Sequence, residues 1–264
     1  MAHDRNERIL AYAWLELKRA SRQNWFFVRA AVHPDWREQG VERQLLTQLW
    51  RAALERRRAL GSKPVEFRTF CATHQEKRIA LFESFGLRPV GYGPHMVCHP
   101  LDNLAEPQVP AGIQVRPYVR GQDDRSALEA LNEGFGDAMD YVPATLEQLR
   151  HRMASSSFRQ ELSPIALDGE VVVGLCLCTV SEGRITLLGR RDAYVDTLAV
   201  RPAYRRRGLG SALLLASLHA MKEAGMESAT LDTEIDNPTQ ASRLYEKIGF
   251  REAWRWVTYG KDIP

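Results

Sequence analysis

A segment in the last third of the chain fixes the order of several secondary-structure elements. The run Tyr194 to Val200 is rich in β-branched and apolar residues and stops at Arg201-Pro202, which is typical of a strand. A turn of arginine and glycine follows, from Arg205 to Gly210. The apolar-periodic run Leu209 to Met221 then predicts a helix. The sequence therefore predicts a strand that passes into a helix through a glycine turn.

The start of that helix is a candidate anion site. The first N–H groups of a helix lack partners within the helix and carry its positive dipole end, so a phosphate is their usual ligand. Gly208 and Gly210 have no Cβ, so a pyrophosphate can come close to the backbone. Arg205, Arg206 and Arg207 add positive charge. The alternative is a basic helix N-terminus that binds nothing, because a short glycine motif is weak by itself.

The same pattern occurs twice in the chain. Residues 33–40 match residues 201–208 at an offset of 168, and residues 80–87 match residues 243–250. Self-similarity of this kind indicates two copies of one unit.

The first copy differs at the positions that would meet a ligand. Glu42 stands where the second copy has Gly210, so a carboxylate and a Cβ would face an approaching phosphate. Phe82 likewise replaces Tyr245. We therefore expect the first copy to act as a packing partner.

The second copy resembles the GNAT superfamily of N-acetyltransferases. The family's acetyl-CoA motif is Arg or Gln, two residues, Gly, one residue, and Gly or Ala, and it is matched by Arg205, Gly208 and Gly210. A second block, residues 237–250, is similar to the family's Asn, then Leu-Tyr-Glu, then Gly-Phe. The resemblance implies an acyltransferase that uses acetyl-CoA as co-substrate and needs no metal.

The resemblance also implies where the cofactor lies. The backbone from Leu198 to Val200 would pair with the pantetheine arm, and the amides from Arg206 to Ser211 would hold the pyrophosphate. Asn237, which precedes Pro238 as a helix N-cap, would also touch the cofactor. The expected cofactor-binding residues are Leu198, Ala199, Val200, Arg205, Arg206, Arg207, Gly208, Leu209, Gly210, Ser211, Asn237 and Tyr245.

Acetyl transfer needs a deprotonated amine, donors to the thioester carbonyl, and an acid for the departing thiolate. Tyr245 is the candidate acid, because the matching tyrosine of the family lies near the cofactor sulfur. The alternative is a core tyrosine, since Tyr245 shares a helical stripe with Leu244 and Ile248.

Three carboxylates are candidates for the base, namely Asp196, Asp232 and Glu234, and we rank the first two above the third. Asp196 is the first, because it lies two residues before Leu198 and should share its strand face. Asp232, in the next strand, is the second. Each could equally be a partner for a nearby arginine.

The expected fold class is α/β, with two GNAT folds in tandem. Each copy would have a central mixed, mostly antiparallel sheet flanked by helices. Residues 1–100 form a degenerate, N-terminally incomplete copy, residues 101–112 a proline-containing linker, and residues 113–264 the catalytic copy. The predicted strands cover residues 8–17, 25–32, 65–71, 113–118, 164–167, 170–180, 194–200 and 253–260, and residues 181–191 form a loop that could close over substrate.

Composition excludes several classes of protein. With 44% hydrophobic and 26% charged residues the chain is typical of globular proteins, and a net charge of +3 is too small to indicate nucleic-acid binding. The basic run Arg56 to Arg58 has no interleaved aromatics, so we expect a solvated helix face there. The alternative is a first copy that binds RNA.

The cysteines and the start of the chain bear on its location. The four cysteines show no zinc spacing, and Cys176 and Cys178 should share one face of a strand without forming a disulfide. The first residues lack the apolar core of a signal peptide, and no apolar run is long enough to cross a membrane. We expect a cytoplasmic monomer with its two copies packed together.

The acceptor is the least determined part of the prediction. Polar and aromatic residues in the segment that should form the acceptor wall hint at a cationic acceptor, or are only surface groups: Phe135, Asp137, Asp140, Tyr141 and Glu147. The expected reaction is transfer of acetyl to a primary amine of a small molecule or peptide by direct attack. The alternative is a non-catalytic acyl-CoA-binding or scaffold protein.

Overall fold

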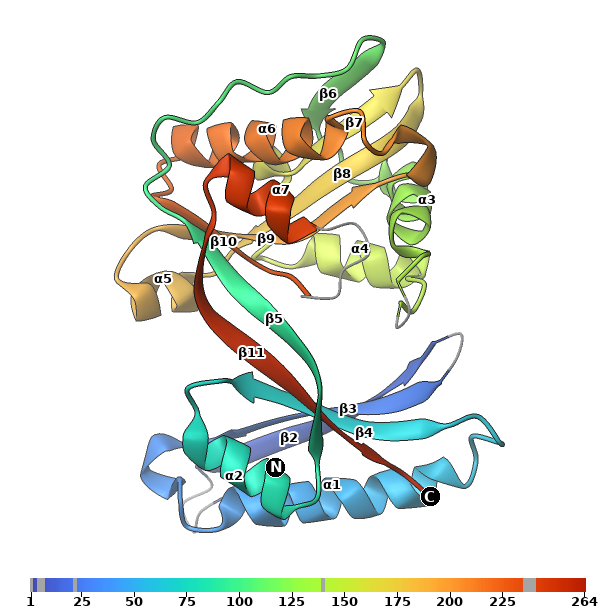
Figure 1. Cartoon of the computed structure of the whole chain (residues 1–264), viewed down its shortest axis with the longest axis vertical. Helices are drawn as coiled ribbons and strands as arrows, with labels where there is room; N and C mark the ends of the chain where they lie inside the picture. The colour runs from blue at the N-terminus through green and yellow to red at the C-terminus, as the bar shows by residue number, and fades with distance from the viewer. Residues whose placement is uncertain (1, 4–7, 21–22, 139–140, 235–240) are drawn as a thin grey trace. The chain divides into compact units, whose positions relative to one another are not determined.

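The computed structural model describes residues 2–3, 8–20, 23–138, 141–234 and 241–264 (Figure 1). They divide into two compact units, one of Met1–Gly93 with Arg255–Pro264 and the other of Pro94–Trp254. Both units combine a sheet with helices, which confirms the predicted α/β class.

The first unit has a sheet with strand order β1-β2-β3-β4-β11. Strand β3 is antiparallel to β2 and parallel to β4, and β11 is antiparallel to β4. Helices α1 and α2 cover one face, where Leu46, Ala53 and Phe82 pack on Phe26 and Phe67. The elements are β1 (Ala2–His3), β2 (Ile9–Arg19), β3 (Asn24–Val32), η1 (Pro34–Trp36), α1 (Val41–Arg57), β4 (Val65–Ala72), α2 (Glu76–Ser84) and β11 (Arg251–Asp262), of which residues 255–262 belong here.

The second unit has a sheet with strand order β5-β10-β9-β8-β7-β6. Only β9 and β10 are parallel among the strand pairs given for this unit, which fits the predicted mixed, mostly antiparallel sheet. The elements are β5 (Arg88–Cys98, residues 94–98 belonging here), β6 (Ile113–Pro117), α3 (Asp124–Phe135), α4 (Leu146–Ala154), η2 (Gln160–Leu162), β7 (Pro164–Asp168), β8 (Val171–Val180), α5 (Glu182–Leu188), β9 (Asp192–Val200), η3 (Pro202–Tyr204), α6 (Leu209–Glu223), β10 (Ser228–Asp232) and α7 (Ala241–Ile248).

Helices cover both faces of the second sheet. Helices α6 and α7 enclose one cluster with Val195 and Cys176, and α3 and α4 enclose another with Leu175 and Leu177. Residues 175 to 177 thus alternate between the faces of β8, as expected for a strand buried on both sides. The helices fix β9, the central strand, between two packed layers.

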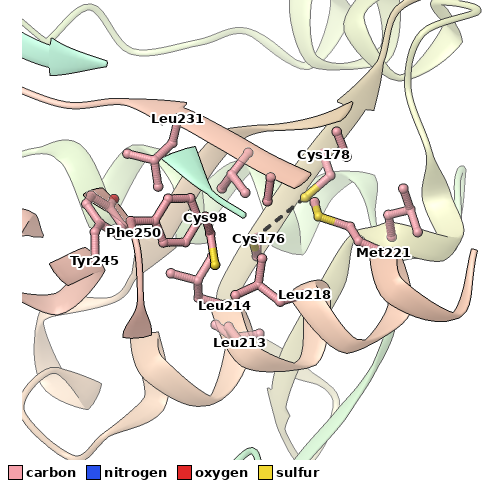
Figure 2. Packing of buried hydrophobic residues seen from close by; sticks show 14 of the residues in the cluster. Cys98, Cys176, Cys178, Leu213, Leu214, Leu218, Met221, Leu231, Tyr245 and Phe250 are labelled. Carbon is pink, nitrogen blue, oxygen red and sulfur yellow. Dashed lines mark hydrogen bonds between the residues drawn. The ribbon is translucent and has the colours of Figure 1, made fainter. Parts of the chain in front are cut away.

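The cysteines of β8 lie as the sequence predicts. The Sγ atoms of Cys176 and Cys178 are 3.9 Å apart, and both face the layer of α6 (Figure 2). All four cysteines of the chain are buried free thiols.

The turns that match in sequence also match in backbone geometry. In the first unit Glu38 and Gly40 have φ of +64° and +81°, and at the matching positions of the second unit Arg206 and Gly208 have +62° and +84°. In each case the glycine is the N-cap of the following helix. A left-handed φ is strained for any residue with a Cβ, so the two turns share an uncommon conformation.

Three features differ from the sequence prediction or were absent from it. Residues 181–191, expected as a loop, contain helix α5, which ends at Gly189 with a left-handed φ of +65°. A glycine with a left-handed φ is a common C-terminal cap, so Gly189 marks the end of a helix and not a loop. Strand β5 had no counterpart in the prediction. The last strand follows the second copy in sequence, yet by contacts its residues from 255 onward belong to the first unit.

Candidate functional site

The turn between β9 and α6 presents an open helix N-terminus. Gly208 is the N-cap of α6 and makes no side-chain cap hydrogen bond, and the first amide bonded back to the cap is that of Ala212, whose N donates to Gly208 O at 3.0 Å. The amides of Leu209, Gly210 and Ser211 lie in the first turn, where intrahelical acceptors are lacking. The expected cradle for an anion is therefore formed by the main chain.

The two glycines of this turn have different physical roles. Gly208 is required by its φ of +84°, and nothing lies within 4 Å of the Cβ that another residue would add. Gly210 has helical geometry, and an added Cβ would meet Leu244 Cδ2 at 3.6 Å and Val200 Cγ2 at 3.8 Å. These are ordinary contacts, so packing within the chain does not demand glycine at position 210.

Two arginines of the turn, Arg205 and Arg207, point in different directions. Arg205 points into the protein, where its Nε donates to Val200 O at 3.2 Å, its Nη2 to Gly134 O at 2.9 Å and its Nη1 to Asp137 Oδ2 at 2.6 Å. Arg207 lies over the ring of Tyr204, with 5.5 Å between the guanidinium carbon and the ring centroid. Arg205 thus holds the turn against α3, whereas Arg207 keeps its charge near the surface.

Strand β9 separates from its parallel neighbour beside the turn. The ladder between β9 and β10 ends at the pair Tyr194 and Thr230. Beyond it Leu198, Ala199 and Val200 pair with residues 174–176 of β8. Within the described ladders, the edge of these three residues that faces away from β8 has no strand partner, which leaves main-chain groups for an extended ligand.

A β-bulge places Asp196 differently from the prediction. Thr197 pairs with Leu177 and Val195 pairs with Cys178, so Asp196 is the extra residue of the bulge. The expectation that Asp196 and Leu198 share a face is wrong, because the bulge shifts the alternation. Asp196 instead joins Thr197 on the side of α4, where Arg152 Nη2 donates to the Asp196 carboxylate and, at 3.0 Å, to Thr197 Oγ1.

Tyr245 lies in the cluster under α6 and α7. It is 8% exposed and packs edge-on against Phe250, with 6.0 Å between ring centroids (Figure 2). No hydrogen bond to its hydroxyl occurs among the residues that the structure describes. Burial, with a smaller contribution from Cys176, raises the pKa of this hydroxyl. It stays protonated at neutral pH and is available as a donor.

Asp232 ends β10 and is held by two donors. Its Oδ1 lies 2.7 Å from His95 Nδ1, and its Oδ2 accepts a hydrogen bond of 2.9 Å from the Tyr194 hydroxyl. Burial, followed by the charge of Asp232, raises the pKa of Tyr194, so the phenol remains the donor. The sequence had singled out neither Tyr194 nor His95 for this role. The signal for His95 is one imidazole in the otherwise apolar run of residues 93–98.

Other expected site residues have partners or lie outside the described chain. Asp137 is bound by Arg205, Phe135 stacks on Tyr141 with centroids 5.5 Å apart, and the Tyr141 hydroxyl donates to Asn132 Oδ1 at 2.6 Å. Glu147 lies in the first turn of α4 and is exposed. Asn237 and Asp140 lie outside the described residues.

Metal-binding clusters and membrane-spanning helices are both absent from the described residues. These residues contain no group of three or more His, Cys, Asp or Glu side chains arranged to hold a metal ion. Across the same ranges, every helix is too short or too polar to span a bilayer.

Comparison with known sequences identifies a family. A profile described as "Acetyltransferase (GNAT) family" matches residues 127–250. The chain is 30% identical over 236 residues to a mycothiol acetyltransferase of Pseudarthrobacter chlorophenolicus, covering 87% of this chain and 68% of that protein. It is 33% identical over 230 residues to the mycothiol acetyltransferase of Kineococcus radiotolerans, covering 86% and 70%.

Solved structures of GNAT proteins share the fold of this chain. A GCN5-related N-acetyltransferase from Sphaerobacter thermophilus superposes with a TM-score of 0.72 at 26% identity, over 99% of this chain and 79% of that one. A tandem GNAT protein from the clavulanic acid biosynthesis pathway superposes with a TM-score of 0.66 at 17% identity, over 99% and 81%. The second likeness is one of fold alone.

Proposed function

Because the chain belongs to the GNAT family and is an acyl-CoA-dependent N-acetyltransferase, we propose that its second copy, residues 113–264, transfers acetyl to a primary amine of a small molecule or peptide. The observation that carries this proposal is the turn before α6. There Gly208 caps the helix without a side-chain hydrogen bond to its first amides, and position 210 has no side chain although packing within the chain would tolerate a Cβ.

We place acetyl-CoA along β9. The pyrophosphate would lie on the amides of Leu209 to Ser211, with Arg206 and Arg207 beside it, and Arg205 supporting the turn from within. The pantetheine arm would follow the unpaired edge of residues 198–200. A strand rises about 3.3 Å per residue, so an arm running back along β9 brings the thioester past Leu198, toward the point where β9 and β10 separate.

Tyr245 is the proposed acid. Its side chain is 8% exposed and its hydroxyl has no protein partner among the described residues, so it is free to donate a hydrogen bond to the sulfur as the C–S bond breaks. At the matching position the first copy has Phe82, whose ring cannot donate.

Two carboxylates remain candidates for the base, and their surroundings differ. Asp196 is ion-paired with Arg152, which competes with an ammonium for its oxygens. Asp232 contacts the Tyr194 hydroxyl and Nδ1 of His95, with no arginine or lysine paired to it among the described residues, and its side chain is 37% exposed. An ionised carboxylate has about four acceptor sites, so two donors leave room for the amine. We therefore favour Asp232 over Asp196.

The protons then balance as follows. An ammonium gives one proton to Asp232, and the neutral amine attacks the carbonyl carbon. When the N–C bond forms and the C–S bond breaks, the second proton leaves the nitrogen and ends on the sulfur, with Tyr245 donating to the thiolate in between. Asp232 returns its proton to solvent.

The first copy is proposed to bind no acetyl-CoA. Its turn has the same backbone, with Gly40 at φ +81° as N-cap. Glu42 nevertheless follows in the first helical turn, at the position of Gly210. A carboxylate there repels a diphosphate, which makes the protein a tandem GNAT with one working site.

We also propose that the protein acts as a monomer in the cytoplasm. Its four cysteines are buried free thiols, which suits a reducing compartment.

Turnover with a panel of amines tests the function. Free thiol is measured with acetyl-CoA and small amines, aminoglycosides, peptide N-termini and the desacetyl form of mycothiol, which the names of the relatives suggest. Saturable thiol release with at least one amine supports the proposal. Tight binding of acetyl-CoA without turnover across the panel would instead support a non-catalytic acyl-CoA-binding protein.

A further inference from the structure

A buried polar chain lies behind Asp232 in the second unit. His95 on β5 is 5% exposed, and its two ring nitrogens contact different charged groups. Nδ1 is 2.7 Å from Asp232 Oδ1, and Nε2 is 3.2 Å from Arg184 Nη2. The ring of His95 also stacks on Trp254, with 4.6 Å between centroids and 22° between planes. Both its plane and its position are therefore fixed.

Arg184 determines which ring nitrogen carries the proton. A guanidinium is always protonated and can only donate, so Nε2 of His95 must accept. The proton of the neutral ring is then on Nδ1, directed at Asp232. Of the two neutral tautomers, the contact with Arg184 therefore favours the one with its hydrogen on Nδ1.

Arg184 is itself held on the opposite side. Its Nε donates to Asp192 Oδ2 at 2.6 Å, and its Nη2 donates to Thr230 Oγ1 at 2.8 Å. Asp192 is fully buried and also accepts from Ser228 Oγ at 2.5 Å. An arginine paired with a buried carboxylate has little freedom, so the chain from Asp192 to Asp232 is rigid.

We propose that His95 is a positioning residue for the acetyl transfer, one that orients the Asp232 carboxylate toward the acceptor amine. The inference deepens the proposed function and rests on it. His95 is not the base, because one nitrogen donates and the other accepts, which leaves no lone pair for a proton. Its action is to hold Oδ1 of Asp232, while Tyr194 holds Oδ2. A rigid carboxylate receives the ammonium proton in one geometry.

Two amide substitutions separate this role from mere packing. In His95→Asn the amide NH₂ comes close to the position of Nδ1 and can still donate to Asp232. In His95→Gln the amide reaches the position of Nε2 and meets Arg184. A misplaced catalytic group costs up to about a hundredfold, so we expect kcat to fall about a hundredfold in His95→Gln and only about threefold in His95→Asn. The KM for acetyl-CoA should be unchanged in both.

A measurement on the unmodified protein complements the variants. The ¹⁵N NMR shifts of the His95 ring should report a protonated Nδ1 and an unprotonated Nε2 at neutral pH. An Nε2–H tautomer, or equal kcat for the two variants at equal thermal stability, would overturn the positioning role while leaving the acetyltransferase function intact. If the unmodified protein turns over no amine, the proposed function fails and this inference fails with it.

Discussion

Arg37 and Arg205 make the same hydrogen bond in the two matching turns of the chain. Arg37 Nε donates to Val32 O at 3.3 Å, and Arg205 Nε donates to Val200 O at 3.2 Å. In both cases the acceptor is the last residue of the strand that precedes the turn. The arginine of this motif therefore closes the turn whether or not a ligand is expected there.

This relationship predicts that substitutions of Arg205 and Arg207 affect different properties, stability in the first case and acetyl-CoA binding in the second. Arg205→Ala removes three charge-assisted hydrogen bonds and should lower the free energy of unfolding by about 1–3 kcal/mol. Arg207→Ala should change stability by no more than about 0.5 kcal/mol but weaken acetyl-CoA binding and its dependence on salt. Urea unfolding and titrations at two salt concentrations check both. Equal stability of the two variants would refute the division.

The hydroxyl of Tyr245 can be removed with little effect on the fold. Phe82 occupies the matching place in the first unit and is buried, so phenylalanine suits this position. We expect Tyr245→Phe to lower kcat about a hundredfold, with an unchanged KM for acetyl-CoA and stability within about 0.5 kcal/mol. The matched control is Phe82→Tyr, which should leave kcat unchanged. Full activity in Tyr245→Phe would make this residue part of the core only.

The two candidate bases are distinguished by their asparagine variants. Asp232→Asn should lower kcat/KM for the amine by about a hundredfold or more, because the amide cannot take the ammonium proton. Asp196→Asn should lower it about tenfold at most, since its ion pair with Arg152 is only partly buried. Steady-state kinetics with the amine varied provide the measurement. A larger loss in Asp196→Asn would reverse the assignment.

Asp124 predicts how stability depends on pH. Burial acts to raise the pKa of this carboxyl, but hydrogen bonds from Tyr118 and Arg150 outweigh it and hold the pKa below its usual value. The unfolded chain therefore takes up this proton first as the pH falls below about 4, and the free energy of unfolding falls with it. Unfolding by urea between pH 6 and pH 2.5 should show the loss.

The control for that prediction is Asp124→Asn, which has no proton to gain at this position. Its free energy of unfolding should be lower than that of the unmodified protein at pH 6 and should fall less steeply toward pH 2.5. If the free energy of unfolding falls equally steeply between pH 6 and pH 2.5 in the two proteins, Asp124 does not contribute to acid sensitivity.

The sequence allowed prediction of features that depend on local patterns. The strand before Arg201, the glycine turn and the helix from Leu209 follow from alternation, helical periodicity and the special φ of glycine. Helix α4 begins after Thr145, which forms a capping box with Gln148, so its start also depends on a local pattern of residues.

Features that depend on distant pairing could not be read from the sequence. A bulge at Asp196 leaves no mark in an alternating run, because it depends on how β8 and β9 pair. The contact of His95 with Asp232 joins residues 137 positions apart. It follows from the pairing of β5 with β10, and β5 itself contains glycines and prolines that obscure its strand pattern.

The central claim is that the helix N-terminus after Gly208 holds a diphosphate and that the first copy's equivalent does not. Titration of the protein with coenzyme A tests it most directly, using Gly210→Glu and the reverse change, Glu42→Gly. Glutamate already occupies this helical position in α1, so the substitution is compatible with the turn. We predict one site per chain, an affinity lowered at least about a hundredfold in Gly210→Glu, and no change in Glu42→Gly. Two sites per chain, or unchanged affinity in Gly210→Glu, would contradict the account.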